Sequence, residues 1–352
     1  MNSKFKSYLF NVIFIISLLT LTTYYIFKEQ NINDIVHYVL QANKFYVGIA
    51  VIMVFLFVCG ESVIIHYLMH RFSYRIPLRT CIRYSFIGFF VSYITPSASG
   101  GQPAQMYYMS KDGIKVSESS LVLMVVTIAY KGVLLFLCAF AMLFEYSFIL
   151  EYMAKSVVLI LVFGIIANTV VVGLLLFVIF KQSFAKTILV TPIIWLGKKK
   201  IIRNYQKWTK KVLAGVMKYE NGAKYLKENK HVFFNVLLMT MVQRFLIMLV
   251  TYYVYKAFGL SGFSMLEIVS LQIMITMCTD CLPLPGGMGA SESFFVLCFN
   301  DIFVKNGIQF VLPGMVLSRG ISFYLVIVVG GMITLVSQFT RNRKQERIVT
   351  KQ

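Results

Sequence analysis

Six ionisable side chains interrupt stretches of sequence that are otherwise apolar. They are three acids and three bases: Glu61, Lys131, Arg244, Asp280, Glu292 and Arg319. A charged side chain at the centre of a bilayer costs at least about 2.5–3.5 kcal/mol on insertion scales, so such residues usually serve a function. A cavity lined by both signs of charge suits an anionic or zwitterionic ligand. Internal ion pairs that lock helices together are the alternative interpretation for each residue.

The composition of the chain indicates where its other charges must lie. Of the 352 residues, 58% are hydrophobic and 14% are charged, whereas soluble domains are about half apolar and about a quarter charged. This excludes a water-soluble globule, a disordered chain and a disulfide-rich secreted module. The 34 Lys and Arg exceed the 14 Asp and Glu by 20, and a membrane protein must keep most of this excess outside the hydrocarbon.

Six stretches are long and apolar enough to cross a membrane, since a spanning helix needs about 20 mostly apolar residues. They lie at about 8–27, 45–69, 117–144, 156–180, 231–256 and 309–337. The first follows Lys4 and Lys6 but lacks a small-residue cleavage site, so we interpret it as a retained span rather than a secretory signal. Two further apolar stretches, 84–95 and 265–282, are too short or too broken to cross.

The distribution of Lys and Arg predicts the orientation, because these residues collect on the cytoplasmic side of bacterial-type membrane proteins. With the amino terminus inside, 26 of them fall in cytoplasmic segments and five in outer segments. We therefore expect a multi-pass protein of the bacterial cell membrane with both termini in the cytoplasm. This orientation requires each of the two short stretches to enter and leave on the same side.

Proline and glycine break both short stretches. The first break reads PSASGGQPAQ (96–105) and the second reads PLPGGMGASE (283–292). A break at membrane depth frees backbone N–H and C=O groups, which is tolerated only inside protein or beside a watery cavity. We therefore expect two re-entrant hairpins, whereas ordinary surface loops are the alternative. Pro103 suits the first turn of one returning helix, and Ser291 and Glu292 suit the start of the other.

The two breaks occupy corresponding places in two halves of the chain, about 45–144 and 231–337. In each half one span precedes the break and another follows it, and the charges place the two hairpins on opposite sides of the membrane. Lys131 lies 30 residues after Gly101, and Arg319 lies 32 residues after Gly287. Interrupted segments at matching positions of inverted halves point to a transport site near the membrane midplane.

The predicted fold class is therefore an all-α integral membrane protein, a polytopic helical bundle of about six full spans plus two re-entrant hairpins in an inverted repeat. Residues 1–340 form one domain, and 341–352 form a basic cytoplasmic tail. Helix starts in the two tips would add backbone N–H donors for a phosphate. The candidate substrate-binding residues are the six charges and the polar or glycine residues of the tips: Glu61, Ser97, Ser99, Gly100, Gly101, Gln102, Lys131, Arg244, Asp280, Gly286, Gly287, Gly289, Glu292 and Arg319.

A strongly basic segment, 181–230, separates the two halves and contains 13 Lys and Arg. Apolar residues recur on one helical face of it, at Ile201, Tyr205, Trp208 and Val212. This pattern predicts an amphipathic helix on the inner membrane surface, attracted to anionic lipid. Nucleic-acid binding is the competing interpretation, but no recognisable RNA module accompanies the basic charge.

No motif for a metal, cofactor or nucleotide stands out. Cys278 and Cys281 form a CxxC pair that lacks a second pair or a nearby His, so it is better explained as small apolar packing. GGMGASE follows no strand and lacks the acid of a dinucleotide-binding βαβ unit. No Walker A motif or nucleophile elbow is present. We therefore expect no cofactor and no metal.

The two broken segments carry a family resemblance. The chain resembles the lysylphosphatidylglycerol synthase transmembrane family, the flippase-like membrane half of the bacterial multiple peptide resistance factor. The resemblance is carried by PSASGGQPAQMYYMSKDGI (96–114) and LPLPGGMGASE (282–292). The resemblance covers about 8–337. It implies a membrane protein whose partner is a phospholipid, phosphatidylglycerol or its lysyl ester, and which carries an aminoacylated phospholipid such as lysyl-phosphatidylglycerol to the outer leaflet. Such transport lowers negative surface charge and resists cationic antimicrobial peptides.

The resemblance leaves other functions open. Full-length family members also have a soluble domain that transfers lysine from lysyl-tRNA to phosphatidylglycerol, and we expect no such domain here because only a short basic tail follows the last span. Phosphatidylglycerol lysyltransferase activity is the second function class, with lysyl-tRNA as its nucleic-acid partner. The third is a non-catalytic partner that recruits a separate aminoacyl-lipid synthase. A homo-oligomer is also left open.

Overall fold

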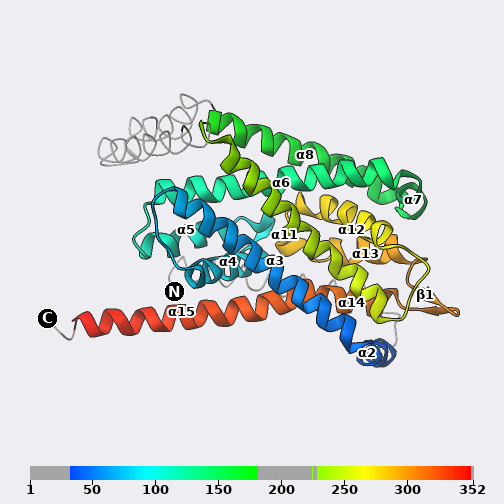
Figure 1. The fold of residues 1–352 in the computed structure, drawn as a ribbon. Coiled ribbons are helices and arrows are strands. Elements are labelled where there is room, and N and C mark those ends of the chain that lie inside the picture. The colour runs from blue at the N-terminus through cyan, green and yellow to red at the C-terminus, as the bar shows by residue number, and fades with distance from the viewer. Residues whose placement is uncertain (1–31, 181–194, 196–223, 225–227, 350–352) are drawn as a thin grey trace.

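The computed structural model describes residues 32–180, 195, 224 and 228–349, and almost all of them are helical (Figure 1). The first half contains α2 (Ile32–Gln41), α3 (Lys44–Arg71), α4 (Leu78–Tyr93), the 3-10 turn η1 (Pro96–Ala98), α5 (Gly101–Lys111) and α6 (Val116–Phe144). Helices α7 (Tyr146–Tyr152) and α8 (Lys155–Phe180) follow. Most of the basic segment 181–230 lies outside the described residues.

The second half repeats this order of long helix, short helix, tight turn and short helix. It contains α11 (Lys230–Ala257), α12 (Met265–Asp280), the 3-10 turn η2 (Pro285–Gly287) and α13 (Ala290–Phe299). Strands β1 (Val304–Lys305) and β2 (Ile308–Gln309) then form a small antiparallel hairpin. The last elements are α14 (Val311–Arg319), the π-helical turn η3 (Gly320–Tyr324) and α15 (Leu325–Val349).

Five helical segments in the described part of the chain are long and apolar enough to cross a membrane. They are Lys44–Arg71, Val116–Phe144, Lys155–Phe177, Lys230–Ala257 and Val311–Thr340. These segments confirm five of the six predicted spans. The remaining one, 8–27, lies outside the described residues.

Two short helical pairs stand between the long helices. Helices α4 and α12 have 16 residues each, which corresponds to about 24 Å, whereas the hydrocarbon is about 30 Å thick. Each is followed by a tight turn and a second short helix that packs back against it, α5 in the first pair and α13 in the second. Each of the two stretches predicted to be too short or too broken to cross is therefore part of a pair of short helices joined by a tight turn. Their re-entrant placement and the inversion of the halves stay predictions.

Local sequence explains where the short helices begin. Ser264 and Glu267 form a reciprocal cap on α12, because Ser264 Oγ accepts from the Glu267 N–H at 3.2 Å and Glu267 Oε2 accepts from the Ser264 N–H at 2.6 Å. At the start of α13 the Gly289 N–H donates to Glu292 Oε2 at 2.8 Å. Side-chain oxygens thus satisfy donors that a helix start leaves without an intrahelical partner.

Two hydrophobic cores lie on either side of the predicted charges along three of the long helices. On α3, the larger core takes residues up to Val58 and the smaller core begins at Ile64. Glu61 lies between them. On α6, Ala129 belongs to the smaller core and Val133 to the larger one. On α11, Val236 belongs to the smaller core and Met248 to the larger one. Lys131 and Arg244 fall in those gaps, so the apolar cores leave a polar layer between them.

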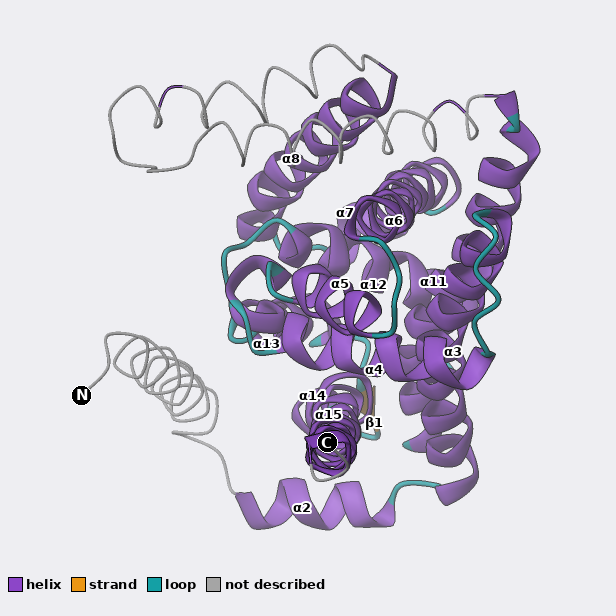
Figure 2. Ribbon diagram, turned by 90° about the vertical axis from the view of Figure 1, so that its left-hand side faces the viewer, coloured by secondary structure: helices purple, strands orange, loops and turns teal. Residues whose placement is uncertain are grey.

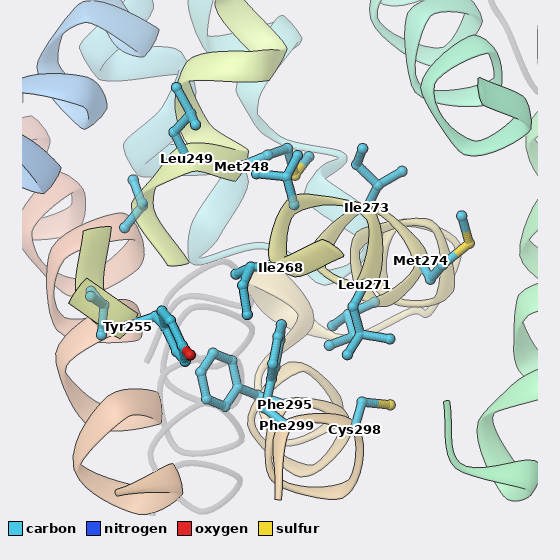
Figure 3. Close-up of a cluster of buried hydrophobic side chains, with 14 of the residues drawn as sticks. Met248, Leu249, Tyr255, Ile268, Leu271, Ile273, Met274, Phe295, Cys298 and Phe299 are labelled. Carbon is cyan, nitrogen blue, oxygen red and sulfur yellow. The ribbon is translucent and has the colours of Figure 1, made fainter. Parts of the chain in front are cut away.

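The larger core closes the end of the bundle that carries the β-strands, here called the strand end. Figure 3 shows Tyr255, Phe295 and Phe299 converging there from α11 and α13, with Ile268 and Leu271 of α12 beside them. Tyr255 is 1% exposed and Phe299 is fully buried. Aromatic rings therefore seal this side of the polar layer.

Side-chain contacts at the other end of the bundle, here called the basic end, join α4 and α6 to the neighbouring loops. Arg83 forms an ion pair with Asp112, and the Tyr84 hydroxyl donates to the same carboxylate at 2.6 Å. The Tyr74 hydroxyl donates to Glu118 at the start of α6. Burial, and then this hydrogen bond to a carboxylate, raise the pKa of Tyr74, which keeps the hydroxyl protonated as a donor.

Helices α3 and α11 make the most extensive contact of any helix pair in the described part of the chain, and α15 packs along α4. Figure 2 looks nearly along the bundle, with α3 and α11 together on one side and α14 and α15 seen end-on beneath α4. At Gly60 an added Cβ would lie 2.9 Å from Gln243 Cγ. This contact explains why a glycine occupies the interface between α3 and α11.

Candidate functional site

The polar layer contains a cavity of about 470 Å³, within the range expected for a small-molecule site. Its walls come from both helical pairs and from α3, α6, α11, α14 and η3. Ten of the fourteen candidate residues predicted from the sequence line it: Glu61, Ser97, Ser99, Gln102, Lys131, Arg244, Asp280, Gly286, Gly287 and Arg319. Residues separated by more than 250 positions in the chain therefore meet around one space.

The two tips, η1 and η2, pack against each other and have matching backbones. In η1, Pro96 is followed by Ser97 and Ala98, each with φ of 52°. In η2, Pro285 is followed by Gly286 and Gly287, with φ of 55° and 68°. Left-handed backbone favours glycine, so η2 has the residue type that this turn requires while η1 holds two side chains in a strained conformation.

This backbone match corrects the pairing of the tips that their glycines suggested. The offsets of Lys131 from Gly101 and of Arg319 from Gly287 assume that the two glycine pairs correspond. The structure instead matches Ser97 with Gly286, because both follow the proline and both have positive φ. The Gly100–Gly101 pair has φ outside this region and begins α5.

Four of the predicted residues lie behind the cavity wall: Gly100, Gly101, Gly289 and Glu292. Gly101 is a packing position, since an added Cβ would collide with Ser92 and lie 2.6 Å from the Gly88 carbonyl oxygen. The Gly100 N–H donates to Thr95 Oγ1 at 3.0 Å, and the Gly289 N–H donates to Glu292. These two N–H groups therefore have partners within the chain, and the use of helix starts in the tips as phosphate donors stays a prediction.

Two of the three cations of the candidate site, Lys131 and Arg319, form ion pairs with carboxylates. Lys131 Nζ lies 2.7 Å from Asp280 Oδ2 and donates to Asn168 Oδ1 at 2.7 Å. The Tyr130 hydroxyl donates to the other oxygen of Asp280. Only 17% of the Lys131 side chain and 12% of the Asp280 side chain are exposed. This pair is neutral as a unit and joins α6 to the end of α12.

The second closed pair fixes the second tip. Arg319 Nε lies 2.7 Å from Glu292 Oε1, and another nitrogen of the guanidinium donates to the Gly286 carbonyl at 3.2 Å. The Arg319 guanidinium carbon is also 4.3 Å from the centre of the Phe323 ring. Phe323 belongs to η3, and π-helical turns often occur at functional sites. Here the turn places a ring directly against Gly286.

Arg244 and Glu61 are arranged differently. Among the residues that the structure describes, no carboxylate lies within 4 Å of Arg244, and its Nε is buried without a hydrogen-bond partner. Its guanidinium carbon lies 3.4 Å from the centre of the Tyr130 ring and 5.2 Å from that of Phe57. Glu61 accepts a hydrogen bond from Gln105 Nε2 at 2.7 Å and likewise has no cation within 4 Å in this part of the chain. Both residues line the cavity.

Sequence reasoning missed several residues that organise these charges. Tyr130, Gln105 and Asn168 each bind a predicted charge, yet none was a candidate. Asn168 had a detectable signal, because it is an amide within an otherwise apolar span. Gln105 lies one helical turn after Gly101, on the face of α5 that the broken motif begins. Tyr130 had no signal beyond its position next to Lys131.

Comparison with known proteins confirms the family resemblance of the two broken segments. The family model described as "Lysylphosphatidylglycerol synthase TM region" matches residues 9–330. This range includes both tips, all five described membrane-spanning segments up to Gly330, and every residue of the candidate site. A search among proteins with curated functions finds no significant match.

Proposed function

The chain belongs to the lysylphosphatidylglycerol synthase TM-region family of membrane proteins, and we propose that it translocates a phospholipid by binding its headgroup in the cavity between the two tips. One observation carries this proposal: Arg244 faces the cavity with no carboxylate within 4 Å in the described part of the chain, while Lys131 and Arg319 each form an ion pair. Arg244 is half-buried and its Nε is buried without a hydrogen-bond partner, and a cation withdrawn from water in this way is costly unless an anion pairs with it. A lipid phosphate is the anion that a bilayer supplies.

Glu61 supplies the complementary charge. It lines the same cavity and has only the neutral Gln105 as a hydrogen-bond partner among the described residues. An ammonium group, as in the lysyl ester of phosphatidylglycerol, would pair with it while the phosphate pairs with Arg244. A zwitterionic headgroup would then satisfy both charges. The four remaining charges would hold the helices around the cavity, because they already form two ion pairs: Lys131 with Asp280 and Arg319 with Glu292.

The mechanism is alternating access around this headgroup site. The two halves of the chain have the same order of elements and meet at their tips. Rocking of one half against the other would expose the site first to one leaflet and then to the other. Delivery of a cationic lipid to the outer leaflet would reduce negative surface charge and thereby raise resistance to cationic antimicrobial peptides.

Exchange of labelled lipid in liposomes tests the proposal. The purified full chain would be reconstituted, and transfer of fluorescent lysyl-phosphatidylglycerol between leaflets would be followed with an impermeant quencher. We expect exchange well above that of protein-free liposomes. Arg244→Gln should slow it at least tenfold, because the phosphate loses its partner. Arg75→Gln is the matched control, since Arg75 is exposed at the basic end.

Two outcomes would contradict the proposal. Exchange by the wild type at the rate of protein-free liposomes would reject translocation. Exchange by Arg244→Gln at the wild-type rate would reject the phosphate site. Formation of lysyl-lipid by the same preparation from charged lysyl-tRNA and phosphatidylglycerol would instead support the transferase alternative.

A further inference from the structure

Glu61 differs from the other two acids of the polar layer, because its hydrogen-bond partner among the described residues is a neutral amide. Gln105 Nε2 donates to Glu61 Oε1 at 2.7 Å, whereas Asp280 and Glu292 each contact a cation at 2.7 Å. Gln105 is 4% exposed, and Glu61 is half-buried beside the cavity. One amide donor offsets only part of the cost of withdrawing a carboxylate from water. Glu61 therefore needs either a cation or a proton.

Packing fixes the position of the Gln105 amide. Gln105 lies on α5, and an added Cβ at Gly88 of α4 would collide with its amide group, so a glycine at position 88 leaves room for it. The carbonyl oxygen of a protonated carboxyl accepts a hydrogen bond as a carboxylate oxygen does. The bond from Gln105 therefore suits both forms of Glu61, and the carboxyl can gain or lose a proton without rearrangement of this neighbour.

Charged and titratable groups reach the cavity from the elements that pack against α3. They are Arg244 on α11, Tyr93 on α4, Tyr130 and Lys131 on α6, and Arg319 directly before η3. Lys131 and Arg319 pair with other carboxylates, and the Tyr130 hydroxyl donates to Asp280. Arg244 lies over the Tyr130 ring and more than 4 Å from the Glu61 carboxyl. No cation in the described part of the chain therefore neutralises Glu61 by direct contact.

A polar route connects Glu61 with the outside of the bundle. At the first tip the cavity is lined by Ser97, Ser99 and Gln102, and all three are exposed. Gln105 follows Gln102 by three residues, which is about one turn of α5. Uncharged polar side chains thus lead from the exposed surface to the Glu61 carboxyl. Water along this route can deliver a proton to Glu61 or accept one from it.

We propose that Glu61 binds the proton that couples lipid movement to a proton gradient, so that the protein is a proton–lipid antiporter. This inference rests on the proposed function, because the proton and the headgroup ammonium compete for the same carboxylate. In one half of the cycle the ammonium displaces the proton, which leaves to water on that side, and the site crosses with lipid. In the other half the lipid leaves, a proton from the opposite side binds Glu61, and the site returns with a neutral carboxyl. One proton therefore moves against each lipid, and an uncompensated carboxylate never crosses the membrane.

Liposomes with a pH gradient test this coupling. The purified full chain would be reconstituted with lysyl-phosphatidylglycerol that carries a fluorophore on an acyl chain, and potassium with valinomycin would hold the membrane potential at zero. An impermeant quencher reports how the lipid divides between the leaflets. With a gradient of about two pH units, we expect the lipid to accumulate at least tenfold in the leaflet on the acidic side, since one-for-one exchange permits a ratio of up to about one hundred. A trapped pH dye should record a proton flux that requires both the chain and the cationic lipid.

Glu61→Gln should abolish both signals, because an amide cannot exchange a proton in this pH range. The leaflet ratio should return to that of protein-free liposomes, and the lipid-dependent proton flux should disappear. Glu151→Gln is the matched control, since Glu151 is an exposed acid on α7 that does not line the cavity. This variant should accumulate lipid as the wild type does.

The failure of the coupling and the failure of the proposed function give different results. Exchange that is intact at equal pH but gains no accumulation from the gradient would overturn the antiport and leave translocation in place. Absence of exchange at equal pH would reject the proposed function itself. Accumulation by Glu61→Gln at the wild-type level would overturn Glu61 as the proton site. If that variant does not fold, the wild type decides, since a proton flux that is the same without the cationic lipid would overturn the antiport.

Discussion

The guanidinium carbon of Arg244 lies 3.4 Å from the centre of the Tyr130 ring, while the hydroxyl of the same tyrosine donates to Asp280. Tyr130 therefore connects Arg244, which has no carboxylate within 4 Å among the described residues, with the ion pair of Lys131 and Asp280. A cation over an aromatic face gains about 2 kcal/mol when desolvated. Unlike a carboxylate, the ring holds the guanidinium in place without neutralising its charge, so the full charge remains for a ligand.

The two roles of Tyr130 can be separated by substitution. Tyr130→Phe keeps the ring and loses only the hydrogen bond to Asp280, so we expect lipid exchange within threefold of the wild type. Tyr130→Leu removes the face on which Arg244 rests and should slow exchange about tenfold, in line with about 1.4 kcal/mol. The liposome assay measures both. Phe136→Leu on the exposed face of α6 is the control, and equal rates for Tyr130→Phe and Tyr130→Leu would argue against the stacking role.

Lys131 and Asp280 should behave as a buried pair whose members depend on each other. Asp280→Asn leaves the Lys131 charge uncompensated and should lower the free energy of unfolding by about 3–5 kcal/mol. The double variant Lys131→Met/Asp280→Leu removes both charges and should recover most of that loss. Thermal unfolding in detergent would measure the difference.

An exposed ion pair provides the comparison for this prediction. Lys224 and Glu228 lie 3.8 Å apart with side chains 69% and 62% exposed. Glu228→Gln should change the unfolding temperature by less than the error of the measurement, because exposed pairs contribute about 0–1 kcal/mol. A double variant at positions 131 and 280 that is no more stable than Asp280→Asn would contradict the pairing.

The two tips should respond oppositely to changes at their matched positions. Ser97 has φ of 52°, so Ser97→Gly should relieve strain and stabilise the protein by roughly 1 kcal/mol. Gly286 has φ of 55°, and an added Cβ would collide with the Phe323 ring. Gly286→Ala should therefore destabilise the protein and displace Arg319 from the Gly286 carbonyl. Thermal unfolding of both variants would test this, and a stabilising Gly286→Ala would show that the match is wrong.

Labelling of introduced cysteines tests the predicted orientation. Asn306 lies in the turn between β1 and β2 at the strand end, and Arg75 lies in the loop between α3 and α4 at the basic end. In intact cells, an impermeant maleimide should label Asn306→Cys and spare Arg75→Cys until the membrane is opened. The six native cysteines are free, and four of them are buried, so the wild type provides the background. The reverse pattern would invert the topology.

The membrane-spanning segments and the two breaks were predictable from the sequence because both depend on local composition. An apolar run of sufficient length has few alternatives to a helix, and a Pro followed by residues such as Gly286 and Gly287 stops one. The charges in the apolar runs were equally visible, because a single Lys131 or Arg244 contrasts with its neighbours. These properties involve only residues that are close together in the chain.

The pairing of those charges was decided by the tertiary structure. Nothing in the spacing of Lys131 and Asp280, which come from different helices, distinguishes that pair from Lys131 with Glu61. Packing brings α6 beside α12 and α3 beside α11, and this arrangement closes two pairs while it leaves Arg244 stacked on Tyr130. The sequence determined that the apolar stretches contain three cations and three acids, and only the packing of distant helices determined that Arg244, unlike Lys131 and Arg319, has no carboxylate within 4 Å among the described residues.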